Sequence, residues 1–191
     1  LLERNGANPV AKSNVPEWAG GHTFNPVYGL TRNPWDISKS AGGSSGGSAS
    51  ALASGQVFLA TGNDLGGSLR TPAGFNGVVG LRPSPGLIPR GDRYMPFDTL
   101  WVEGPMARTV EDLALMLDSM VGHDIGDPLS FKSKTGYFIE SLKKDLKPIS
   151  IAVSEDLNLV PVDYAVPTIR SLSGAIIVFG FSLYPYVYLI T

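Results

Sequence analysis

Alternating short strands and helices predict an α/β fold in which a mixed β-sheet is layered with helices. Three features of the sequence support this prediction. Apolar runs of strand length alternate with stretches whose apolar residues recur at helical spacing. Glycine (23 residues) and proline (15 residues) are scattered along the chain, so tight turns join many short elements. The length of 191 residues and the apolar fraction of 43% suit one domain with a buried core.

The first predicted elements lie in a segment at residues 42–86, where glycine and serine cluster between short apolar runs. Small residues favour a short helix there, and Gly and Pro mark its limits and those of its neighbours. In chain order, the sequence predicts a helix at 48–53 that ends at Gly55, a buried strand at 57–60, a helical turn opened by Thr71 with Pro72 at its first position, and a strand at 78–81.

A longer helix is predicted after Thr109, which forms a capping-box pattern with Asp112. The apolar residues that follow recur at helical spacing up to Val121, and Gly122 stands where a C-terminal cap belongs. This helix is expected to belong to the core. The remaining predictions are a strand at 149–153, a helix at about 165–178 and a strand at 181–188.

Residues 171–191 carry no charge, and a stretch of that length is formally a candidate for a membrane span. Gly174, Gly180 and Pro185 interrupt it, however, and tyrosines alternate near its end as they would along a strand. We therefore expect a buried helix followed by a buried strand, and no membrane partner.

The composition excludes several classes of chemistry. There is no cysteine, so disulfides, thiolate catalysis and Cys-ligated zinc are excluded, and two histidines argue against a His-rich metal site. The formal net charge of -2 gives no electrostatic reason to expect nucleic acid as a partner. We expect neither a cofactor nor a metal, and a cytoplasmic protein fits this composition.

Two glycine-serine loops carry the candidate chemistry: Gly-Gly-Ser-Ser-Gly-Gly at residues 42–47 and Asp-Leu-Gly-Gly-Ser at residues 64–68. Phosphate binding is disfavoured, because neither a P-loop nor a dinucleotide pattern occurs. The first loop matches the G-x-S-x-G elbow of α/β-hydrolases, but such an elbow follows a buried strand, whereas residues 33–41 have the composition of a loop. We interpret this match as fortuitous.

Acyl transfer through Ser68 explains the second loop better. Gly66 and Gly67 let the backbone curl, so that successive N–H groups can converge on one point and stabilise an oxyanion. A serine hydroxyl needs a base to become a nucleophile, and with histidine scarce a Ser-Lys arrangement is the natural variant. The competing interpretation is a glycine turn that only lets a strand and a helix pack closely.

The combined motifs resemble those of the amidase-signature family, in the order in which that family has them. The likeness runs from the start of the chain to about Leu159. The segments that carry it are residues 11–17, 31–35, 42–49, 62–73, 77–83 and 104–110. The resemblance implies an amidase-signature-like core and an enzyme that hydrolyses a carboxylic amide C–N bond through an acyl-serine intermediate.

The resemblance also implies roles for individual residues. Ser68 corresponds to the nucleophile of a Ser-cisSer-Lys triad, and Ser44 to the bridging serine, which follows a cis peptide bond and lies within hydrogen-bonding reach of Ser68. The oxyanion hole would come from the N–H groups of Leu65, Gly66, Gly67 and Ser68. Three supporting residues are expected to brace these loops: Ser45, Asp64 and Arg70. Ser44 and Ser45 could also cap the helix that follows them.

The family's catalytic lysine lies upstream of residues 11–17, where Lys12 matches a different lysine of the pattern, and Lys39 is interpreted as a solvated loop charge. We therefore expect residues 1–191 to be a partial domain that lacks this lysine and the family's C-terminal half, and to have little activity by itself. The expected substrate is a small-molecule amide. The sequence does not decide whether the protein forms a homo-oligomer. The alternatives are a non-catalytic remnant and a subunit of an amidotransferase assembly.

Overall fold

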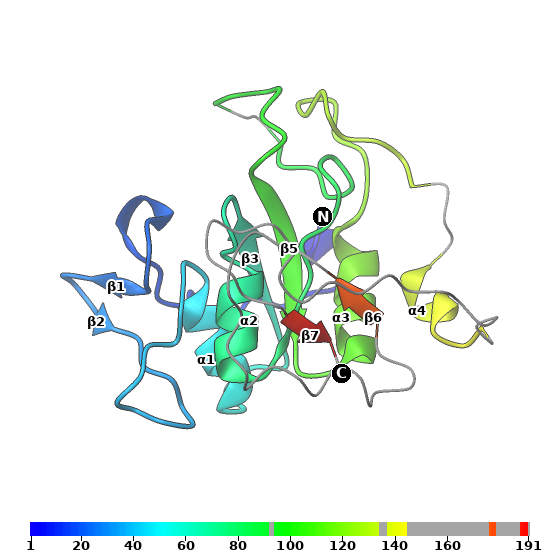
Figure 1. Cartoon of the computed structure of the whole chain (residues 1–191). Helices are drawn as coiled ribbons and strands as arrows, with labels where there is room; N and C mark the ends of the chain where they lie inside the picture. The colour runs from blue at the N-terminus through cyan, green and yellow to red at the C-terminus, as the bar shows by residue number, and fades with distance from the viewer. Residues whose placement is uncertain (92–93, 134–136, 145–175, 179–187, 191) are drawn as a thin grey trace, which may run out of the picture.

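A three-stranded sheet organises the fold, as the computed structural model of the chain shows (Figure 1). The structure describes residues 1–91, 94–133, 137–144, 176–178 and 188–190. The strands of the sheet are β3 (Leu59–Asp64), β4 (Val79–Gly80) and β5 (Val102–Ala107), in the order β3-β5-β4. The other elements, in chain order, are the 3-10 helices η1 (Glu3–Asn5) and η2 (Glu17–Ala19), strands β1 (Phe24–Asn25) and β2 (Gly29–Leu30), helices α1 (Gly46–Ala53), α2 (Arg70–Asn76), α3 (Val110–Met120) and α4 (Phe138–Ser141), and strands β6 (Ile176–Val178) and β7 (Tyr188–Ile190).

Helices cover both faces of the sheet, so the α/β class with helices layered on a sheet is confirmed (Figure 1). Met106 and Ala107 are neighbours in β5 and therefore point to opposite faces. Met106 packs in a cluster with Leu52 of α1 and with Leu69, which precedes α2. Ala107 packs with Leu113 of α3 on the other face. The sheet and its two flanking layers thus form one core.

The direction of the strands differs from the prediction of a mixed sheet, because each pair of strands in the described residues is antiparallel. β3, α2 and β4 follow one another in the chain, and the two strands run in the same direction. Strand β5 then lies between them and pairs antiparallel with both. β5 follows the loop at residues 81–101, so the local alternation of strands and helices does not indicate this insertion.

Helix α1 is confirmed where the sequence predicts it, whereas the next strand is shifted. The strand predicted at 57–60 begins at Leu59 and continues to Asp64, and each of its residues pairs with β5. The sequence hid this extension because its second half is polar and contains Gly62. A Cβ on Gly62 would lie 2.7 Å from the Ser45 hydroxyl oxygen, so the strand needs glycine at this point for close packing.

Two helix boundaries also differ from the prediction. Helix α2 begins at Arg70, so Pro72 is its third residue, which is tolerated because the first four N–H groups of a helix have no intrahelical acceptor. Helix α3 ends with Val121 as its C-cap at φ −69°, so Gly122 is not the cap. The Gly122 N–H donates to the carbonyl of Leu87, 3.3 Å away, and joins the end of α3 to the loop before β5.

The predictions for the last third of the chain fall mostly outside the described residues, including the strand at 149–153. The helix predicted at 165–178 is wrong at its end, because residues 176–178 form β6 and pair antiparallel with β7. The β-branched run of these three residues favours a strand. The strand predicted at 181–188 is described only at Tyr188, which is the first residue of β7. Among the described residues, helices are too short or too polar to cross a membrane.

The N-terminus of α3 gives a direct test of the sequence-based prediction. Thr109 Oγ1 accepts a hydrogen bond from the N–H of Asp112 at 3.1 Å, as the capping-box pattern predicts. Thr109→Ala should therefore lower the free energy of unfolding by about 1 kcal/mol in urea titrations. The control is Ser119→Ala, which removes an exposed hydroxyl near the other end of the helix and should change stability by less than about 0.5 kcal/mol. Equal effects of the two substitutions would contradict a capping role.

Candidate active site

The turn that carries Ser68 joins β3 to α2 and is fixed by the carboxylate of Asp64. We call residues 65–69 the Ser68 turn. Asp64 is fully buried at the end of β3. Its Oδ1 accepts from the N–H of Gly67 at 2.8 Å, and its Oδ2 accepts from the N–H of Leu69 at 3.2 Å. Gly67 has φ +119°, a conformation that favours glycine, so the backbone can curl around the carboxylate.

Two arginines complete the surroundings of Asp64. Arg70, the first residue of α2, donates from Nε to Oδ2 and from Nη2 to Oδ1, each at 3.0 Å. Arg82 Nη1 lies 3.1 Å from Oδ1 and also donates to the Asp64 carbonyl. Asp64 and Arg70 thus contact each other and the turn, and the supporting role that the sequence predicts for them stays a prediction. Arg82 was missed as a site residue, although it stands in one of the motifs, because its role depends on a distant contact.

These contacts also set the protonation state of Asp64. Burial alone would raise the pKa of its carboxyl group. The hydrogen bonds and the positive charge of Arg70 lower this pKa, and so do the hydrogen bonds from the N–H groups of Gly67 and Leu69. The pKa of Asp64 consequently lies below its ordinary value, and the group is a carboxylate at neutral pH. A buried charge with this many partners allows few alternative conformations of the turn.

The loop at residues 42–47 needs its glycines because other backbone segments press against it. A Cβ on Gly43 would overlap the carbonyl of Gly21, and one on Gly47 would overlap the backbone of Asn14. A Cβ on Gly46 would overlap Thr23, and Gly42 has φ +74°. Close packing therefore explains why this loop is glycine-rich, independently of any chemistry.

Thr23 is a second residue that the sequence did not reveal. Its side chain is fully buried, and its hydroxyl oxygen accepts from the N–H of Gly46 at 2.9 Å. The same hydroxyl lies within donating distance of two carbonyls, those of Gly42 at 3.0 Å and Ser44 at 3.1 Å. Thr23 thereby caps α1, and the expectation that Ser44 or Ser45 caps this helix is wrong: Ser45 occupies the N-cap position without a capping side-chain bond.

The two loops meet through Ser45. Its N–H donates to the carbonyl of Ser68 at 3.3 Å, and its hydroxyl lies 3.3 Å from the N–H of Asn63. Ser44 is buried, and the peptide bond between Gly43 and Ser44 is cis, as the resemblance implied. The expected hydrogen bond between the hydroxyls of Ser44 and Ser68 does not occur among the described residues. The hydrogen bond from the Ser45 N–H to the Ser68 carbonyl joins the backbones of the two loops. The directions of the Ser44 and Ser68 hydroxyls depend on the rotamers of these side chains.

One predicted oxyanion donor needs correction. The Gly67 N–H points to Asp64, so it cannot simultaneously donate to an oxyanion on the substrate. The N–H groups of Leu65 and Ser68, by contrast, have no acceptor among the described residues. Leu65 is 55% exposed, so the start of the turn can be reached by another molecule.

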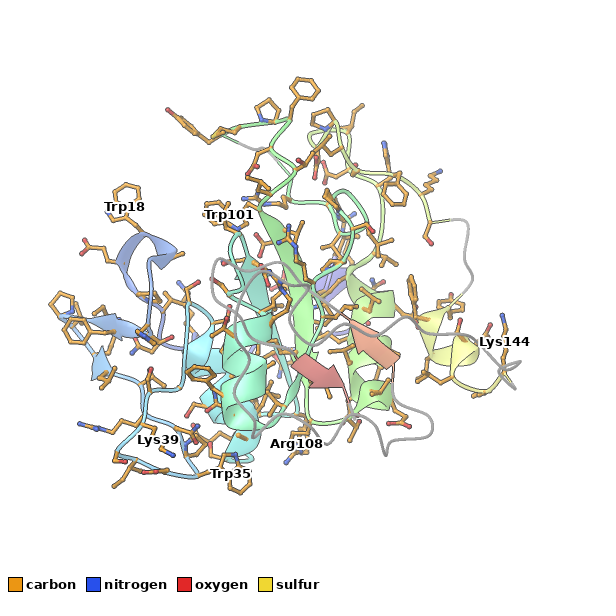
Figure 2. The ribbon with its side chains drawn as sticks, viewed as in Figure 1. Trp18, Trp35, Lys39, Trp101, Arg108 and Lys144 are labelled. Carbon is orange, nitrogen blue, oxygen red and sulfur yellow. The ribbon has the colours of Figure 1, made fainter. Side chains whose placement is uncertain are left out.

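The lysine nearest in sequence to Ser44 is Lys39. Its side chain is 73% exposed and forms an ion pair with Asp36, which confirms it as a solvated loop charge. Figure 2 shows Lys39 and Lys144 on opposite outer edges of the molecule.

Comparison with solved structures identifies the same fold in several enzymes. A bacterial aryl acylamidase of the amidase-signature enzymes is 41% identical, with a TM-score of 0.63 over 68% of this chain and 27% of that one. A 6-aminohexanoate cyclic dimer hydrolase is 38% identical, with a TM-score of 0.67 over 71% of this chain and 29% of that one. The peptide amidase of Stenotrophomonas maltophilia is 34% identical, with a TM-score of 0.64 over 74% and 31%.

Sequence comparison gives the family. The amidase family model matches residues 1–171, and the chain therefore belongs to the amidase family. A glutamyl-tRNA(Gln) amidotransferase subunit of Lactiplantibacillus plantarum is 45% identical over 77% of this chain, and its namesake from Sulfolobus acidocaldarius is 45% identical over 82%. The chain spans only 30% and 33% of the length of these two curated relatives.

The Asp64 cluster predicts a specific dependence of stability on pH. A group whose pKa is lowered by folding stabilises the protein above its unfolded pKa, about 3.9 for Asp, and this contribution is lost as the pH falls through the folded value. Asp64→Asn should lower the free energy of unfolding at pH 7 by about 3–5 kcal/mol, because Arg70 and Arg82 lose their buried partner. Below pH 4 the difference from the wild type should shrink.

Urea titrations between pH 3 and pH 7 measure this effect. The control is Glu111→Gln, which removes an exposed carboxylate in the first turn of α3. A constant difference between Asp64→Asn and the wild type over the whole pH range would show that the ionised carboxylate contributes nothing to stability.

Proposed function

We propose that this protein is a serine amidase in which Ser68 attacks the carbonyl carbon of a carboxylic amide. The observation that carries the proposal is the geometry of the Ser68 turn: Asp64 binds the backbone on both sides of Ser68, while the N–H groups of Leu65 and Ser68 stay without an acceptor among the described residues. N–H groups that remain available on a fixed turn can stabilise the oxyanion that forms when a serine attacks a carbonyl.

The reaction would proceed in two stages. In the first, the Ser68 hydroxyl oxygen forms a bond with the carbonyl carbon, the C–N bond breaks, and the amine leaves with a proton. In the second, water attacks the resulting ester, releases the carboxylic acid and returns the proton to Ser68. The oxyanion in both stages would lie near the N–H groups of Leu65, Gly66 and Ser68. Each such donor contributes roughly 3–4 kcal/mol in comparable enzymes.

Ser44 is proposed as the bridge for the proton that leaves Ser68. Its buried position and the bond from Ser45 to the Ser68 carbonyl place the two loops side by side. By resemblance, a lysine of the family upstream of residues 11–17 accepts the proton. We propose that rotation of the Ser44 and Ser68 side chains brings their hydroxyls together, because the bond from Ser45 to the Ser68 carbonyl joins the backbones of the two loops. Ser45, Asp64 and Arg70 would support this geometry without touching the substrate.

A second candidate function is the role of one component in an amidotransferase assembly. The names of the two relatives with 45% identity favour it, and it would use the same acyl-Ser68 chemistry together with protein partners. In either case we propose a small-molecule amide as the substrate and a cytoplasmic location. Residues 1–191 would then be part of one amidase-signature domain, in keeping with the third of the relatives' length that they span. Measurement of the ammonia released from a primary amide, with and without co-purifying proteins, separates the two functions, because an amidase releases it unaided.

The proposal predicts a single reactive serine in the protein produced from its natural gene. A fluorophosphonate probe should label Ser68, and Ser68→Ala should abolish both labelling and amide turnover. Ser44→Ala should keep the fold and lower kcat by at least about 10³-fold, because members of a catalytic triad act as a unit. Ser54→Ala, an exposed serine after α1, is the matched control and should behave as the wild type. Labelling that persists in Ser68→Ala would refute the assignment.

A further inference from the structure

The hydroxyl of Thr23 contacts more of the loop at residues 42–47 than a helix cap requires. A cap of α1 needs only an acceptor for a free N–H group, which Thr23 Oγ1 supplies to Gly46 at 2.9 Å. The same oxygen also lies 3.1 Å from the carbonyl oxygen of Ser44, in a position to donate to it. This second contact has no part in capping α1, and it reaches the backbone of the residue proposed as the proton bridge.

The single hydroxyl hydrogen of Thr23 is available for this second contact. The Gly42 carbonyl, 3.0 Å from Oγ1, already accepts from the backbone N–H of Thr23 at 3.1 Å. A hydroxyl group donates one hydrogen bond and can accept another. The hydroxyl of Thr23 can therefore donate to Ser44 while it accepts from Gly46. One residue thus holds the backbone of the loop before, at and after Ser44.

The short segment that ends at Thr23 lies directly against the loop on both sides of Ser44. A Cβ on Gly43 would overlap the carbonyl of Gly21. A Cβ on Gly46 would overlap the side chain of Thr23. Ser44, between these two contacts, is only 2% exposed. Close packing therefore restricts the backbone of Ser44, and the hydrogen bonds of Thr23 set where it lies.

Thr23 is also held in place from outside the loop. It is fully buried, and its carbonyl accepts from the N–H of Thr31 at 2.9 Å, in the segment after β2. The Thr31 carbonyl in turn accepts from the N–H of Ala41 at 3.3 Å, one residue before the loop. Because these bonds hold the backbone of Thr23, its hydroxyl is a fixed point against which Ser44 is placed.

We propose that Thr23 is a positioning residue of the amidase reaction: it holds the backbone of Ser44 so that the Ser44 hydroxyl can take the proton of Ser68. Thr23 acts through Ser44 and does not touch the substrate, because its side chain is fully buried. This inference rests on the proposed function, in which Ser44 is the bridge. Misplacement of a catalytic group by about 1 Å can slow a reaction roughly 100-fold, so loss of the Thr23 hydroxyl should affect the rate and not binding.

Phosphonylation of Ser68 by a fluorophosphonate tests this role in the protein produced from its natural gene. The two quantities measured are the maximal rate and the probe concentration that gives half of it. Ser68 loses its proton as its oxygen bonds to phosphorus and fluoride leaves, so the maximal rate reports the proton bridge. Thr23→Val keeps the shape of the side chain and removes the hydroxyl. It should lower the maximal rate by about 10- to 100-fold and change the half-saturating concentration by less than about twofold.

A double-mutant cycle with Ser44→Ala separates action through Ser44 from a general effect on the fold. In the Ser44→Ala background, whose slower labelling is followed over hours, Thr23→Val should change the rate by less than about twofold, because the bridge is already absent. Thr23→Ser keeps the hydroxyl, and its rate should stay within about threefold of the wild type. The control is Thr99→Val, the same exchange at an exposed threonine in the loop before β5, which should match the wild type.

The outcomes separate the two proposals. An unchanged rate in Thr23→Val, or an equal fall with and without Ser44, overturns the positioning role, and Ser68 remains the nucleophile. If circular dichroism shows that Thr23→Val does not fold, Thr23→Ala takes its place. Failure of both to fold assigns Thr23 to the fold alone and also overturns the role. If the wild type is labelled at another serine or not at all, the proposed function fails, and the positioning role fails with it.

Discussion

The buried carboxylate of Asp64 is the constraint on which the site depends. A charge in a low-dielectric interior is tolerated only when it is paired and hydrogen-bonded, and Asp64 obtains its partners from three different parts of the chain. The Ser68 turn gives two N–H groups, α2 gives Arg70, and the segment after β4 gives Arg82. The cluster can be satisfied only if the turn, the helix and the loop before β5 take their observed places. Satisfaction of one charge therefore fixes the position of Ser68 relative to the sheet.

Close backbone packing supplies the second half of the site. The loop at residues 42–47 lies against the segments around Asn14 and Gly21, and its glycines are necessary because a Cβ would overlap their backbone. Thr23 then satisfies the polar groups that such packing buries. Ser45 connects this loop to the Ser68 turn through the Ser68 carbonyl. The same arrangement that stabilises the N-terminus of α1 thus brings Ser44 beside the proposed nucleophile.

The sequence predicts those parts of this arrangement that depend on local patterns. The small-residue helix α1, the capped start of α3 and the braces Asp64 and Arg70 could be predicted from short motifs. Contacts between distant segments could not: β5 inserts between β3 and β4 after a long loop, and neither Thr23 nor Arg82 has a neighbour in the sequence that reveals its partner. The resemblance to the amidase-signature family places Gly67 in the oxyanion hole, whereas in the structure its N–H donates to Asp64. Residues 176–178 show the same limit, because helical spacing outweighed a β-branched run there.

The rate at which a fluorophosphonate phosphonylates Ser68 in Asp64→Asn, with loss of fluoride, tests the central claim that the Asp64 carboxylate positions the nucleophile. The rate is compared with that of the wild type at pH 7, under conditions in which circular dichroism shows both proteins to be folded. Without the carboxylate the N–H groups of Gly67 and Leu69 lose their charged acceptor, and displacement of the turn by about 1 Å should slow phosphonylation of Ser68 by roughly 100-fold. An unchanged rate in folded Asp64→Asn would show that Ser68 keeps its position without this cluster, and would contradict the account.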